Sequence, residues 1–70
     1  MESLPPGMHR ALRQAQLYGY LVEREGKLFH PGGSQPVCGM QIARALAQQG
    51  WLVHRADRYE ITPDGMMAAN

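Results

Sequence analysis

The side chains that could bind a metal ion or act as nucleophiles are few and scattered. Three histidines and one cysteine are the candidate metal ligands: His9, His30, Cys38 and His54. They show none of the paired spacings at which zinc ligands occur. Ser3 and Ser34 lie in loop-like contexts without a histidine and a carboxylate to activate them. The glycine-rich stretch 31–34 lacks the lysine of a P-loop. We therefore expect no enzyme, metal site or cofactor.

Cys38 leaves two interpretations open. It directly precedes a predicted helix, whose backbone N–H groups could lower the thiol pKa and make it reactive. A small, buried hydrophobic side chain is the favoured alternative. A lone cysteine cannot close an internal disulfide, and the chain shows neither a signal peptide nor a membrane-length apolar run. The sequence therefore predicts a cytoplasmic protein without membrane contact.

Length and composition predict one globular domain over residues 1–70, with flexible ends at 1–6 and 67–70. Seventy residues can build only one hydrophobic core, and 44% hydrophobic with 19% charged residues is typical of folded proteins. The net charge of +1 does not by itself indicate nucleic-acid binding. The distribution of the basic side chains must therefore decide whether a nucleic acid or a protein is the expected partner.

One segment occurs twice along the chain. GYLVEREGK, from Gly19, aligns with GWLVHRADR, from Gly50, at a shift of 31 residues. Each glycine follows a helical pattern and can adopt the left-handed conformation that ends a helix. Two copies are too few for a solenoid, so we expect pseudo-symmetry within one domain.

Each copy predicts a helix followed by a two-stranded hairpin. The apolar stripe of the first helix is Met8, Ala11, Leu12, Ala15 and Tyr18 or Gly19, and that of the second is Gly39, Ile42, Ala43 and Leu46. The first hairpin pairs 20–24 with 27–30, and the second pairs 51–55 with 58–62. The strand residues expected in the shared core are Leu21, Leu28, Leu52, Val53 and Ile61.

The predicted fold class is α+β with the order αββαββ. Thr62-Pro63 offers a capping residue and a proline at the first helical position, which predicts a short last helix over 63–69. Whether the hairpins join into one sheet or stay separate ribbons is open at this point.

Two stretches, QIARALAQQGWLV at 41–53 and RYEITPDG at 58–65, resemble the small winged helix-turn-helix domains of bacterial and phage regulators. The shared pattern is a helix ending in glycine, an aliphatic strand, a basic turn, a second strand and Thr-Pro-x-Gly. The first half departs from the family, because 20–30 predicts a hairpin where members have a second helix.

The resemblance implies a DNA-binding or transcription-regulatory module bound to double-stranded DNA. Because one such domain contacts little DNA, we expect a homodimer. Its implied base-reading residues are Gln41, Arg44 and Gln48, with Arg55 and Arg58 at phosphates beside the wing and Arg10 and Arg13 as further backbone contacts. The alternative is a non-enzymatic protein-interaction module, such as a phage or mobile-element accessory or inhibitor protein, which the near-neutral charge favours.

Overall fold

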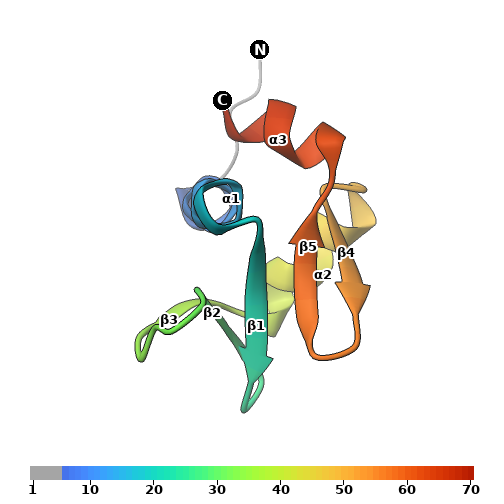
Figure 1. Ribbon diagram of the computed structural model, residues 1–70. Helices are drawn as coiled ribbons and strands as arrows, with labels where there is room; N and C mark the ends of the chain where they lie inside the picture. The colour runs from blue at the N-terminus through green and yellow to red at the C-terminus, as the bar shows by residue number, and fades with distance from the viewer. Residues whose placement is uncertain (1–5) are drawn as a thin grey trace.

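The computed structural model describes residues 6–70, which form three helices and five strands (Figure 1). Their order is α1 (Pro6–Tyr18), β1 (Tyr20–Arg24), β2 (Lys27–Phe29), β3 (Pro36–Gly39), α2 (Met40–Gln48), β4 (Leu52–Arg55), β5 (Arg58–Ile61) and α3 (Pro63–Ala69). The α+β class is confirmed. The predicted flexible N-terminal end falls, at residues 1–5, outside the described chain.

The two copies of the repeated segment adopt alike conformations. Gly19 and Gly50, which end α1 and α2, have φ angles of 90° and 82°, in the left-handed region that favours glycine. At the tips of the hairpins Glu25 and Ala56 also have matching positive φ angles, of 53° and 56°. The predicted helix ends and both hairpins are confirmed.

The hairpins join into a single antiparallel sheet with strand order β3-β2-β1-β5-β4. The junction is the pairing of β1 with β5, in which Leu21 lies opposite Tyr59 and Val22 opposite Arg58. In the repeat β1 corresponds to β4 and β2 to β5, so equivalent strands alternate across the sheet. A shift by two strands, rather than a rotation, therefore relates the two hairpins.

The three helices share one core with this sheet: α2 lies against one face, and α1 and α3 close the core at one end of the strands. The largest fully buried side chains are Leu12, Leu21, Leu28 and Leu46. They form one cluster with Ala11 and Ala15 of α1, Ala43 of α2, Leu52 and Tyr59 of the sheet, and Ala69 of α3. In Figure 1 α2 lies behind β1 and β5, while α1 and α3 lie at one end of the strands. The opposite face carries no helix among residues 6–70.

Three of the expected apolar positions need correction. Tyr18 or Gly19 was expected on the apolar stripe of α1, but both residues are exposed. Val53 was expected in the core but is 36% exposed, because it follows the buried Leu52 and successive strand residues point to opposite faces. Gly39 was expected on the apolar stripe of α2, but it ends β3, caps α2 and is exposed. Ile61 is half-buried against the core.

Strand β3 was not predicted, so the observed order is α1β1β2β3α2β4β5α3 rather than αββαββ. It is an edge strand that pairs with β2, where Leu28 lies opposite Cys38 and Phe29 opposite Pro36. Its sequence, Pro-Val-Cys-Gly, has the proline and glycine that normally indicate a loop, and both are tolerated because the strand lies at an edge.

The predicted C-terminal helix is confirmed. Thr62 caps α3: its side-chain oxygen accepts a hydrogen bond from the Gly65 N–H at 3.0 Å, and Pro63 occupies the first turn. In the first copy Pro31 stands at the position equivalent to Thr62 and has no hydroxyl to cap a helix. The chain there turns through the left-handed Gly32 instead and continues towards β3.

Candidate nucleic-acid interface

Helix α2 presents the three residues implied in base reading as one exposed stripe. Gln41, Arg44 and Gln48 are all exposed and are spaced three and four residues apart, so they share one side of the helix. The other side buries Ala43 and Leu46 against the sheet. Arg44 makes no ion pair with any residue of the described chain.

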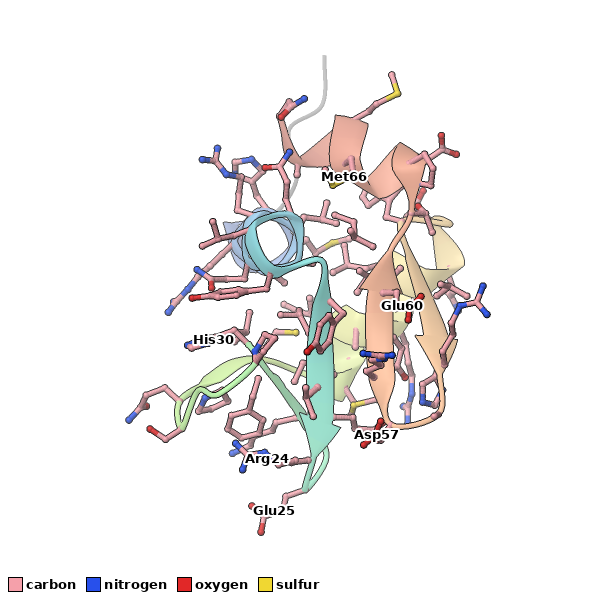
Figure 2. The ribbon with its side chains drawn as sticks, in the orientation of Figure 1. Arg24, Glu25, His30, Asp57, Glu60 and Met66 are labelled. Atoms are coloured by element: carbon pink, nitrogen blue, oxygen red, sulfur yellow. The ribbon has the colours of Figure 1, made fainter. Side chains whose placement is uncertain are left out.

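Arg55 and Arg58 lie opposite each other on the β4–β5 hairpin. Both guanidinium groups contact the Glu60 carboxylate, with Nε–O distances of 3.2 Å for Arg55 and 3.4 Å for Arg58. Residues 58 and 60 flank the buried Tyr59, so these side chains point away from the helices. Figure 2 shows Glu60 on the side of β5 facing the viewer, with the helix α2 behind.

The structure therefore divides the predicted site between two sides of the sheet. Gln41, Arg44 and Gln48 belong to the helix-covered side, and Arg55 with Arg58 belongs to the helix-free side. Each subset is brought together, but the two do not form one continuous surface. Arg10 and Arg13 are exposed on α1 and join neither subset.

We call the helix-free side of the four hairpin strands, β1, β2, β4 and β5, the outer face. Its side chains, assigned from strand alternation and register, are Tyr20, Val22, Arg24, Lys27, Phe29, Val53, Arg55, Arg58 and Glu60. The Arg24 guanidinium lies over the Phe29 ring at 4.2 Å from its centre, and that of Arg58 over the Tyr20 ring at 4.7 Å. Arg24 and Lys27 were not among the predicted site residues, although alternation from the buried Leu21 and Leu28 places both on the side of the first hairpin that points away from the core.

A small polar cluster lies on the opposite, helix-covered side of the hairpins. His54 stacks on Tyr59 with ring centres 4.4 Å apart, and its Nε2 lies 3.4 Å from the Glu23 carboxylate. Burial raises the pKa of Tyr59, the Glu23 charge raises it further, and Arg44 lowers it. Arg44 is thus close enough to this cluster for its charge to be felt there.

Cys38 on β3 is half-buried, and the burial raises its pKa to about 11. The thiol is therefore protonated at neutral pH, which favours the small hydrophobic role over the reactive one. Within residues 6–70, no three histidine, cysteine or carboxylate side chains are grouped so that they could hold a metal ion. None of the described helices has the length and hydropathy needed to cross a bilayer.

Comparison with known proteins identifies no relative of this chain. No protein-family model matches the chain, and searches of curated proteins and of solved structures find no match.

Proposed function

We propose that the chain is a small winged-helix-like DNA-binding module of the regulatory type, with α2 as its groove-contacting helix. The observation that carries the proposal is that Gln41, Arg44 and Gln48 form one exposed stripe on α2. Arg44 makes no ion pair within the described chain, so its guanidinium is available to a partner. Arginine can pair with guanine and glutamine with adenine in the major groove.

The elements around α2 support this function. Gly50 ends the helix and leads directly into the β4–β5 hairpin, which follows α2 as the wing follows the recognition helix in winged-helix domains. Thr62 caps the helix that comes next. Arg55 and Arg58 flank the Ala56–Asp57 turn, where they can contact phosphates beside the groove. A single domain of this size contacts little DNA, so the active form we propose is a homodimer on two half-sites.

Titration of mixed-sequence duplex DNA at low and moderate salt tests this proposal. Phosphate contacts release counterions, so the affinity must fall steeply as salt rises. Arg44→Gln should weaken specific binding by about 1–3 kcal/mol and leave the melting temperature nearly unchanged. Arg10→Gln, an equal charge change on α1, is the control. Absence of duplex binding at low salt refutes the proposal, and so does an equal loss in both variants.

A protein-interaction module is the second candidate, and exposed apolar side chains favour it. Leu17 at the end of α1 is 71% exposed and Met67 on α3 is 74% exposed. Strand β4 ends the sheet and is paired only with β5 within the described chain, so its free edge could accept a partner strand. A protein that fails to bind duplex DNA but forms a dimer sensitive to Leu17→Gln would support this second function.

A further inference from the structure

The outer face gathers most of the positive charge of the protein. Four of the seven lysines and arginines point from it: Arg24, Lys27, Arg55 and Arg58. The one carboxylate among its side chains is Glu60, and Glu25 and Asp57 lie in the turns at its end (Figure 2). The face opposite α2 is thus more basic than α2 itself, which carries only Arg44.

The basic residues of the outer face repeat along the sheet. At the shift of 31 residues Arg24 corresponds to Arg55 and Lys27 to Arg58. The hairpins follow each other by two strands, about 10 Å across the sheet, and Arg58 lies opposite Val22, two residues along β1 from Arg24, so the basic pair recurs after about 12 Å. A repeated pair of cations on one face is complementary to a polymer with regularly repeated negative charge.

Two of these cations are already held in position. The Arg24 guanidinium lies on the Phe29 ring and donates a hydrogen bond to the Gly33 carbonyl at 2.8 Å. The Arg58 guanidinium lies on the Tyr20 ring. A guanidinium stacked on a ring keeps its other flat side free for a nucleobase and its remaining N–H groups free for phosphate. Their ordering therefore costs less entropy on binding than that of free side chains.

A hollow beside the basic row is large enough for an unstacked base. It is an open depression of about 320 Å³ between the outer face and the turn after β2, and is lined by Val22, Arg24, Phe29, His30, Gly32 and Gly33. The exposed Arg24 guanidinium, itself stacked on the buried Phe29, is the group in its walls on which a base can stack, because the His30 ring is already stacked on Tyr18 with ring centres 4.9 Å apart. A base within a duplex cannot leave its stack to enter such a hollow without a cost of a few kcal/mol.

From these observations we infer that the outer face binds single-stranded nucleic acid, with the backbone along the four cations and a base in the hollow. This site is distinct from the base-reading stripe of α2, because it lies on the opposite side of the sheet. Arg55 and Arg58 belong to both proposals, whereas Gln41, Arg44 and Gln48 belong to the duplex site alone and Arg24 and Lys27 to the single-strand site alone.

The test is fluorescence anisotropy with a labelled oligodeoxythymidylate of about 12 nucleotides, a length within the usual single-strand site sizes. Arg24→Gln combined with Arg58→Gln should lower the affinity about tenfold or more. The slope of log K against log salt should fall by about 1.4, which corresponds to two lost phosphate contacts. Arg10→Gln combined with Arg13→Gln removes the same charge from α1 and should change neither quantity. Circular dichroism melting verifies that each variant is folded.

Glu60→Gln provides a gain-of-function arm that does not depend on a weakened variant. Loss of its carboxylate releases Arg55 and Arg58 from their ion pairs, so the affinity for the oligothymidylate should rise several-fold. The inference is overturned if the wild-type protein does not bind the oligothymidylate at low salt, if both double variants lose equal affinity, or if Glu60→Gln binds no more tightly. It is also overturned if a duplex of equal length binds this face more tightly than the single strand.

These measurements test the two proposals separately. Arg44→Gln should weaken duplex binding and leave oligothymidylate binding unchanged, whereas the Arg24 and Arg58 double variant should retain the base preference of duplex binding. Loss of one activity in the wild-type protein therefore refutes one proposal without refuting the other.

Discussion

Removal of the Thr62 hydroxyl tests most directly how the end of α2 is connected to the start of α3. Its hydroxyl donates a hydrogen bond to the Gly50 carbonyl at 2.6 Å and accepts one from the Gly65 N–H at 3.0 Å. One group thus connects the residue that ends α2 to the first turn of α3. Thr62→Val removes both hydrogen bonds and keeps nearly the same shape, so no cavity complicates the result.

The expected loss follows from the exposure of the two bonds. The bond to Gly50 is exposed, so water replaces it at a cost of about 0.5 kcal/mol, while the partly buried cap at Gly65 is worth about 1–1.5 kcal/mol. Together these give about 1.5–2 kcal/mol of unfolding free energy. A domain of this size loses about 4–8 °C per kcal/mol, so the melting temperature should fall by about 6–16 °C.

Thermal unfolding followed by circular dichroism measures this change, with Thr62→Ser as the matched control. Serine retains both hydrogen bonds and loses only a half-buried methyl group, so its melting temperature should fall by less than about 4 °C. Amide hydrogen exchange at Gly65 should accelerate in Thr62→Val and not in Thr62→Ser. The reasoning is refuted if Thr62→Val has the melting temperature of the wild-type protein, or if Thr62→Ser has the melting temperature of Thr62→Val. In either case the hydroxyl does not stabilise this junction.

Two further predictions concern the core. Leu46→Ala should cost about 2–5 kcal/mol in denaturant unfolding, because Leu46 is fully buried at the centre of the shared core; a loss below about 1 kcal/mol would contradict its placement. Cys38, with its pKa raised from 9.0 to about 11, should carry about 100-fold less thiolate at pH 8 than an unperturbed thiol, and iodoacetamide should alkylate it correspondingly slowly. Because the unfolded chain ionises first, stability should fall as pH rises from 9 to 11; Cys38→Ala should reduce that fall, leaving the contribution of Tyr59, whose pKa is also raised.

The sequence was informative where local chemistry decides the structure. Glycine at 19 and 50 and the Thr62-Pro63 cap each specify a conformation through the residues themselves. Strand β3 could not be derived in this way. Its four residues are extended because β2 offers them an unpaired edge, and that edge exists only once the sheet is assembled.

The site was predictable residue by residue but not as a surface. Periodicity placed Gln41, Arg44 and Gln48 on one side of a helix, as observed. It could not show that Arg55 and Arg58 lie on the opposite side of the sheet, because this depends on which face of the sheet the helices cover. That choice follows from the burial of Leu21, Leu28, Leu52 and Tyr59, a set complete only when β1 pairs with β5.

The basic outer face also bears on how the sheet finds its register. A slip of one residue between β1 and β5 would turn Arg58 and Glu60 towards the helices and Tyr59 towards solvent. A buried cation that loses its partner costs several kcal/mol, so the slipped pairing is strongly disfavoured. Glutamine at 24 and 58 lowers that penalty without removing it, because a buried amide also requires hydrogen-bond partners. The variants that test single-strand binding should therefore keep the native register, which makes loss of binding a measure of the surface rather than of the fold.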